Sequence, residues 1–244
     1  NIRSIYNTPL GDILPAQPSG PVIEDAFRPM LTAKGRRHPV TAGLPGDNAK
    51  TPNWGRWFRQ VEAVANRGQT LMTGSGEQPL LILDRVGKGR IAQFMSDHIW
   101  LWARGFDGGG PHAELMRRTS HWLMQEPDLE EEDLRASVEG NRLTIQRRSL
   151  DPALPNVTLT SPSGAKEGVT LTPTPDGSAK ATVEITETGL YRIEDGRRRA
   201  MAAAGRLNPP ELADLRASAE PLLPVIKASG GGTAWIAEGL PDLR

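Results

Sequence analysis

The stretch Gly87–Trp122, GKGRIAQFMSDHIWLWARGFDGGGPHAELMRRTSHW, decides the fold that the first half of the chain predicts. It opens with an apolar run typical of a buried strand over residues 90–95, followed by a polar tip at residues 96–98. Two tryptophans and a glycine run then lead into a helical pattern. Strand ends, loops and helix N-termini are where α/β folds hold their ligands. The stretch therefore predicts an α/β domain with its candidate functional residues at the strand tip.

The flanking segments extend this prediction. Residues 1 to about 60 are rich in proline and glycine and predict loops and short turns. Residues 69–72 predict a short strand, and the continuous apolar run over residues 79–84 predicts a strand covered on both faces. Residues 91–95 then form its antiparallel partner or a neighbouring strand. Proline suits a first helical turn, so a helix is predicted from His112 to Met124, with an apolar stripe of Leu115, Thr119, Trp122 and Leu123.

Composition limits the classes of protein that the chain can represent. Its 244 residues hold one large domain or two ordinary ones, and 37% apolar with 24% charged residues is typical of a globular protein. Lysine plus arginine and aspartate plus glutamate number 29 each, so no overall field favours nucleic acid or an anionic membrane. The absence of cysteine excludes disulfides, thiolate metal sites and a cysteine nucleophile within these residues. Because the chain begins at Asn1, we expect a processed product or a piece of a longer protein.

The second half of the chain changes character after an acidic connector, residues 127–133. Five segments between residues 135 and 200 alternate polar and apolar residues and predict a small β-sandwich, with one strand expected over residues 168–172. In the tail, Asn208, Pro209 and Glu211 predict a helix start, and Gly230–Gly232 its end. We therefore expect an α/β domain over residues 1–128, a β-sandwich over 134–204 and a helical tail over 205–244.

Residues 89–97, GRIAQFMSD, resemble the strand that ends in Gln-Phe-His-Pro-Glu in class I glutamine amidotransferases. Gln93 and Phe94 match that motif. The run SDHIWLWAR, residues 96–104, is similar to a signature of amidotransferase-like domains in large bacterial membrane proteins that also carry a von Willebrand A-type domain. The resemblance implies a flavodoxin-like α/β fold of the class I glutamine amidotransferase type, whole or partial, followed by a β-sandwich.

The same resemblance implies a degenerate domain. The position of the family's catalytic histidine falls on Met95, which cannot accept a proton, and the chain has no cysteine to act as the nucleophile. We therefore expect a non-catalytic binding or assembly module of a bacterial membrane-anchored protein, with its soluble portion in the periplasm. Its expected partners are other domains of the same membrane protein or another protein, with no nucleic acid, and membrane attachment comes through segments outside these residues.

Asp97, His98 and His112 are the candidate catalytic residues for a competing hypothesis, a hydrolase or amidotransferase-type enzyme with or without metal assistance. Asp97 and His98 point to opposite faces if the strand continues, and converge if it ends at Ser96. They either form a small polar ligand site or serve the local turn. His112 and Glu114 lie about 200° apart on a helix and cannot chelate together. We expect no metal and no cofactor.

Aromatic residues supply the candidates for partner or ligand binding. Trp100 and Trp102 share one face if their segment is extended, where they either anchor the loop on the core or form a platform for a sugar, a peptide or a partner domain. Trp54 and Trp57 are expected to join them, and Arg104 to contribute a charge. The glycine run before His112 lacks the lysine and spacing of a phosphate-binding loop, so we expect a flexible or tightly turned loop.

Overall fold

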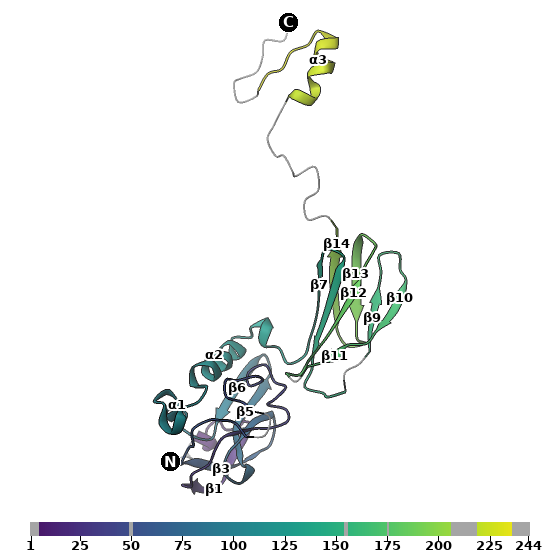
Figure 1. Ribbon diagram of the computed structural model, residues 1–244. Helices are drawn as coiled ribbons and strands as arrows, with labels where there is room; N and C mark the ends of the chain where they lie inside the picture. The colour runs from purple at the N-terminus through teal and green to yellow at the C-terminus, as the bar shows by residue number, and fades with distance from the viewer. Residues whose placement is uncertain (1–4, 49–50, 154–155, 175, 206–218, 236–244) are drawn as a thin grey trace. The chain divides into compact units, whose positions relative to one another are not determined.

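The computed structural model describes residues 5–48, 51–153, 156–174, 176–205 and 219–235. The chain divides into two compact units, residues 1–204 and 205–244 (Figure 1). Within the first unit we distinguish three parts: the N-terminal lobe (residues 5–129), the connector (residues 130–132) and the sandwich (residues 133–204).

A four-stranded antiparallel sheet forms the centre of the N-terminal lobe. In spatial order its strands are β2 (Met30–Leu31), β4 (Gln69–Thr73), β5 (Pro79–Val86) and β6 (Gly89–Phe94). Four consecutive side chains of β5 are buried, those of Leu80, Leu81, Ile82 and Leu83. The short strand β4 and the two-sided burial of β5 confirm what their sequence patterns predict.

The direction of these strands overturns the predicted α/β fold. β5 and β6 are joined by a two-residue turn, in which Gly87 has a φ of +58° as the first position of such a turn requires. A turn this short joins only antiparallel neighbours, whereas parallel strands need a long crossover, usually a helix. All four sheets in the described part of the chain are small and antiparallel. The expectation of a flavodoxin-like α/β domain over residues 1–128 is therefore wrong.

A second, two-stranded sheet lies in the segment that predicted mainly loops. β1 (Ala16–Ile23) pairs with β3 (Gln60–Ala65) in antiparallel register, with an irregularity between Pro18 and Val22. Proline is tolerated in β1 because it is an edge strand. Gln93 of β6 ties this sheet to the first one, because its amide accepts from the Ala16 N–H (2.9 Å) and donates to the Ala16 carbonyl (3.0 Å).

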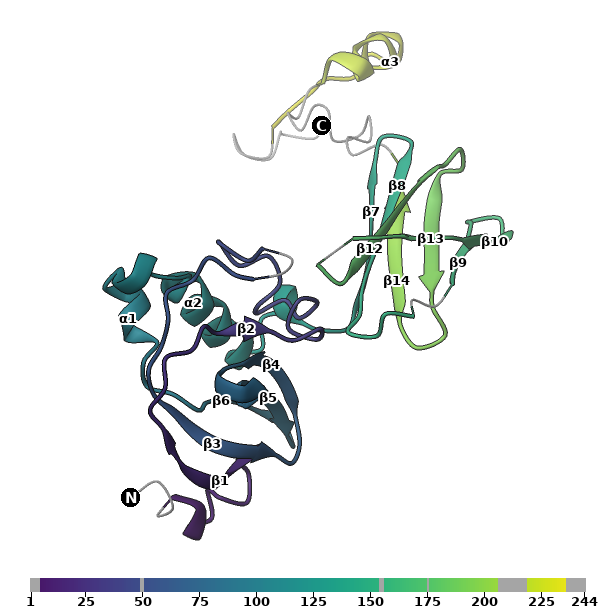
Figure 2. The same ribbon diagram turned by 60° about the horizontal axis from the view of Figure 1, so that its bottom comes forward.

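Two α-helices follow β6 in the chain, α1 (Trp100–Ala103) and α2 (His112–Leu123). α2 confirms the predicted helix and packs against β6 (Figures 1 and 2). It buries Leu115, Thr119 and Trp122 as expected, whereas Leu123 is 39% exposed. Short 3₁₀ turns complete the lobe: η1 (Ile5–Asn7), η2 (Ser75–Glu77), η3 (Phe106–Gly108) and η4 (Pro127–Leu129).

The sandwich confirms the all-β prediction for the second half of the chain. One sheet has the order β11-β12-β8-β7 and the other β10-β9-β13-β14. The strand bounds are β7 (Asp133–Glu139), β8 (Arg142–Arg148), β9 (Val157–Thr160), β10 (Lys166–Val169), β11 (Thr172–Pro173), β12 (Ser178–Glu184), β13 (Gly189–Glu194) and β14 (Arg199–Ala204). The strand expected over residues 168–172 is instead divided between β10 and β11, which belong to different sheets. Leu143, Ile145, Val157 and Ile193 are fully buried in the core that the two sheets share.

The second unit contains η6 (Glu220–Leu222) and α3 (Leu223–Ser229), which ends at Gly230 in a left-handed conformation (φ +69°). The helix end predicted at Gly230–Gly232 is therefore confirmed. The helix start expected at residues 208–211 lies outside the described residues. Within the described part of the chain, no helix is both long and apolar enough to cross a membrane.

Candidate functional site

The tip that follows β6 is fixed by backbone and side-chain hydrogen bonds. The Met95 N–H donates to the Leu80 carbonyl (2.8 Å), and its carbonyl accepts from the Val61 N–H (2.7 Å), so the strand pairing extends to this residue. The Ser96 hydroxyl donates to the Arg59 carbonyl (2.6 Å) and accepts from the His98 N–H (3.1 Å). The strand pairing thus stops before Ser96, and the Ser96 hydroxyl closes the turn that presents the next two residues.

Asp97 is held by an arginine that is distant in the sequence. Arg59, the residue before β3, contacts both carboxylate oxygens of Asp97, and its Nε lies 3.2 Å from Oδ1. This guanidinium holds the pKa of Asp97 below its ordinary value. The two side chains are 48% and 60% exposed, so the pair is a charged surface feature at the tip.

His98 does not pair with Asp97. Its Nδ1 accepts a hydrogen bond from the Phe58 N–H (3.1 Å), which assigns the proton of the neutral ring to Nε2. Its ring also meets the Trp100 ring edge-on, with centroids 6.4 Å apart. His98 therefore joins the tip to the segment before β3, which is the local role that the sequence left open.

A pocket of about 440 Å³ opens beside the ion pair. Its walls are partly apolar, from Val22, Val61, Phe94 and Met95, and partly polar, from Glu24, Arg59, Gln60, Ser96 and Asp97. A volume of this size lies in the range of small-ligand sites. The tip therefore combines a charged pair with a hollow surface.

The tryptophans do not form one platform. Trp54, Trp57 and Trp102 are buried and pack together, with ring centroids of 5.3 Å for Trp54–Trp102 and 4.8 Å for Trp57–Trp102. The segment carrying Trp100 is a helical turn rather than an extended strand, so Trp100 and Trp102 face in different directions. The expectation that they share one face is wrong, and Trp100, at 52% exposed, is the one of these four that a partner can reach.

Trp100 belongs to a contiguous aromatic surface that the sequence only partly indicates. Phe58 meets Phe106 edge-on at 5.6 Å, and Phe58 donates through its N–H to His98, which contacts Trp100. We call these four residues the aromatic rim. Phe106 is 45% exposed. Phe58 and Phe106 lie 48 positions apart in the printed sequence, so no local pattern brings them together.

Arginines surround the aromatic rim. Arg56 pairs with Asp107 (Nε–Oδ2 2.8 Å), which lowers the pKa of that carboxyl. Arg104 follows α1 and is exposed, and its guanidinium has no hydrogen-bond or ion-pair partner in the described part of the chain. The predicted binding residue Arg104 is thus placed beside Trp100 with its charge available.

The glycine run is a tightly turned loop. The Gly55 N–H donates to the Gly109 carbonyl (2.5 Å), and the Trp102 indole donates to the Gly55 carbonyl (2.8 Å). A Cβ on Gly110 would lie 2.4 Å from the Trp102 ring. The run therefore lets the backbone approach the buried tryptophans, which accounts for its glycines without a bound phosphate.

His112 stands apart from the tip. Its side chain makes no hydrogen bond or ion pair with Asp97 or His98 among the described residues. Over the same residues, no group of three histidine, aspartate or glutamate side chains is placed to hold a metal ion. The three candidate catalytic residues thus do not form one site. Asp97 is ion-paired with Arg59, and His98 accepts a hydrogen bond from the Phe58 N–H.

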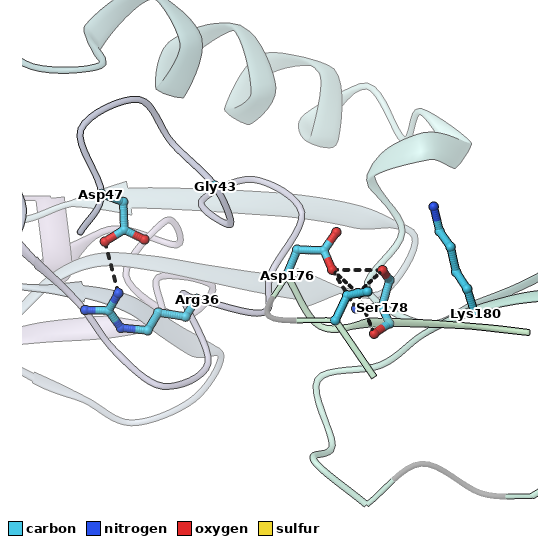
Figure 3. A pocket seen from close by; sticks show the side chains of 7 residues that line it. Arg36, Gly43, Asp47, Asp176, Ser178 and Lys180 are labelled. Atoms are coloured by element: carbon cyan, nitrogen blue, oxygen red, sulfur yellow. Dashed lines mark hydrogen bonds and ion pairs between the residues drawn. The ribbon is translucent and has the colours of Figure 1, made fainter. Parts of the chain in front are cut away.

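A second cavity, of about 460 Å³, is lined by Arg36, Gly43 and Asp47 of the N-terminal lobe and by Thr174, Asp176, Ser178 and Lys180 of the sandwich (Figure 3). Its carboxylates are held by contacts within one part of the molecule. Arg36 pairs with Asp47 (3.0 Å), and Asp176 accepts from Ser178 and Thr174 within one turn. We therefore locate the candidate site at the tip and the aromatic rim.

Comparison with known proteins finds no family model and no curated protein that matches this chain. The resemblance to amidotransferase-like domains therefore remains a hypothesis based on residues 89–104.

Proposed function

We propose that this chain is a non-catalytic binding module that captures an acidic protein segment on its aromatic rim. The segment belongs to another domain of the same protein or to a separate protein. On the resemblance alone, the proposal places the module in a bacterial membrane-anchored protein, on the periplasmic side.

The observation that carries the proposal is the half-exposed Trp100 ring on a rigid base. Tryptophan and other aromatic residues dominate the centres of protein interfaces because they bury a large area at a small entropy cost. The helical turn that carries Trp100 also carries the buried Trp102, whose indole is bonded to Gly55. The exposed ring is thus held in place before any partner arrives, which lowers the cost of binding.

The charges around the rim indicate the chemistry of the partner. Four arginines lie at or beside it, against three carboxylates: Arg28, Arg56, Arg59 and Arg104 against Glu24, Asp97 and Asp107. The rim therefore carries a net positive charge although the whole chain is neutral. A partner with carboxylates beside an apolar or aromatic side chain complements this surface, since charge complementarity sets specificity and association rate.

The same contacts weigh against catalysis at the tip. A general base must be free to take a proton from a substrate. Asp97 is ion-paired through both oxygens, and the Nδ1 of His98 already accepts a backbone N–H. Both groups serve the shape of the surface in this arrangement.

Site-specific photo-crosslinking tests the proposal. A photoreactive phenylalanine analogue replaces Trp100 in the protein expressed in the organism that naturally produces it. The crosslinked peptide is then sequenced by mass spectrometry. We expect one dominant product whose crosslinked segment is acidic. Met201 of β14, which is 66% exposed on the sandwich, is the control position and should give no such product.

Two charge-reversal variants then test specificity. Arg104→Glu should weaken capture of the crosslinked segment about tenfold at low salt, because one attractive charge becomes repulsive. Lys88→Glu makes the same charge change in the exposed β5–β6 turn and should leave capture unchanged. A neutral or basic segment, or equal effects of the two variants, would overturn the proposal.

A further inference from the structure

The connector is the place where the N-terminal lobe meets the sandwich. Two of its three glutamates form ion pairs with the N-terminal lobe, and the third binds the sandwich. Glu130 and Glu131 pair with Arg85 of β5, and Glu130 also pairs with Arg90 of β6. Glu132 instead accepts from Arg147 (2.6 Å) and from the Ser149 hydroxyl (2.7 Å) of the sandwich. A segment whose composition predicts a solvated linker is therefore bonded to both sides.

A second set of contacts joins the N-terminal lobe to the sandwich. The guanidinium of Arg37 donates to the carbonyls of Ser149 (3.1 Å) and Asp151 (2.8 Å). The next residue along the chain, His38, is fully buried. Arg37 thus joins the lobe to the sandwich, and His38 joins the lobe to the connector.

Both nitrogens of the His38 ring are occupied. Nδ1 accepts the Val40 N–H (3.1 Å), so in the neutral ring the proton is on Nε2, which lies 3.2 Å from Glu131 Oε1. The Trp122 indole donates to the same carboxylate oxygen (3.0 Å). The neutral ring therefore satisfies every hydrogen bond at this position.

We propose that His38 and Glu131 form a pH-sensitive latch, which holds the connector on the N-terminal lobe at neutral pH and releases it in mild acid. The latch couples acidity to the freedom of the sandwich relative to the lobe.

The groups that face His38 oppose a second proton on its ring. A proton on Nδ1 would point at the Val40 N–H and break that bond. Glu131 would attract the new charge, but Arg85 already compensates this carboxylate. Arg85 and Arg148 both act against a positive ring, and the edge of the Trp122 ring, with centroids 6.0 Å apart, covers it from α2. A charged ring is thus better accommodated after the connector has moved away.

The direction of the pKa shift agrees with this geometry. Burial lowers the pKa of His38, and the nearby arginines add to that effect, against the opposing pull of Glu131. Burial raises the pKa of Glu131, but its hydrogen bonds from His38 and Arg85 outweigh this and bring it to about 2. Of these two groups, only His38 therefore changes charge in mild acid.

The sign of the pH dependence follows from the lowered pKa. The closed latch prefers neutral His38, so its stability is fully present above the ordinary histidine pKa of about 6.5. It is lost as the pH falls from there toward the lower pKa of the closed form. Across that interval the equilibrium constant for opening rises up to about tenfold per pH unit.

Distance measurements on a cysteine-free chain test the latch directly. Because the chain contains no cysteine, Lys88→Cys and Asn141→Cys give one unique pair of spin labels on exposed turns of the lobe and the sandwich. We expect a narrow distance distribution at about pH 7.5 and a broad one, with longer distances, at about pH 5. The His38→Gln variant keeps a neutral donor for Glu131 and should give the same distribution at both pH values.

Hydrogen exchange of the Val40 amide in the unlabelled wild-type chain is the second measurement. Its protection should fall with pH across the same interval, because its acceptor is the Nδ1 of His38. An unchanged distance distribution together with constant Val40 protection would overturn the latch. So would acid broadening of the same size in folded His38→Gln. If that variant does not fold, the wild-type exchange profile decides.

Discussion

Ion pairs between arginine and aspartate occur both at the surface and in the interior of this molecule. Arg59 and Asp97 are each about half exposed, where water screens a pair to about 0–1 kcal/mol. Arg147 is 2% exposed and contacts Asp195 (Nε–Oδ2 2.5 Å) within the sandwich. A buried pair adds little net stability, but removal of one partner leaves an uncompensated charge. Residue Arg147 therefore constrains the sandwich, whereas Arg59 only shapes a surface.

Asp195→Asn tests this difference at the residue scale. Its amide oxygen can still accept from the Arg197 and Arg198 N–H groups, so the change mainly removes the charge beside Arg147. Because Glu132 still pairs with Arg147, we expect a loss of about 1–3 kcal/mol in the free energy of unfolding, measured by urea denaturation. The adjacent Glu194→Gln breaks the exposed pair with Arg199 and should cost less than about 1 kcal/mol. Equal losses for the two variants would contradict the assignment.

Secondary-structure elements were predictable where burial follows a simple period. The apolar run of β5 and the stripe of α2 both form as expected, because one element covers the whole pattern. The sequence leaves the direction of the β5–β6 pair open, because a fully buried strand has the same composition in parallel and antiparallel sheets. The sequence does not predict α1, because two tryptophans two positions apart share one face in an extended strand and therefore indicate a strand. At the candidate site, the sequence points to Asp97 and Trp100 but not to Arg59, because the pairing of Arg59 with Asp97 depends on the long-range hydrogen bond between Val61 and Met95.

Gly110→Ala tests the loop that positions α1. A Cβ at this position would lie 2.4 Å from the rigid Trp102 ring, whereas Gly168 in β10 has nothing within 4 Å. Neither residue has a positive φ, so the comparison isolates steric contact. We expect Gly110→Ala to lower the stability by about 1–3 kcal/mol and to change tryptophan fluorescence. Gly168→Ala should leave the fluorescence and the thermal midpoint nearly unchanged, and a similar result for both variants would refute the steric account.

At the scale of the whole molecule, the first unit has separate apolar cores joined by polar contacts. The core of the N-terminal lobe centres on its tryptophans and β5, and that of the sandwich on residues of β8, β9 and β13, with no buried apolar residue in common. The contacts between them include ion pairs and hydrogen bonds of the connector and of Arg37, and those of Arg135 and Arg148 with Pro127 and Asp128. Contacts of this kind respond to pH and salt far more than an apolar interface does. Coupling between the two parts is therefore adjustable without unfolding either one.

Separate cores lead to a prediction for the isolated sandwich. A fragment of residues 130–204 retains Glu132 with Arg147 and all residues of its own core, so we expect it to fold as a β domain at neutral pH. Far-UV circular dichroism and the dispersion of amide signals in NMR spectra measure this. Leu143→Ala, which empties a fully buried position, should lower its stability by about 2–5 kcal/mol and serves as the sensitivity control. A fragment that stays unfolded would show that the lobe contributes to the sandwich core, and the boundary near residue 130 would then not separate domains.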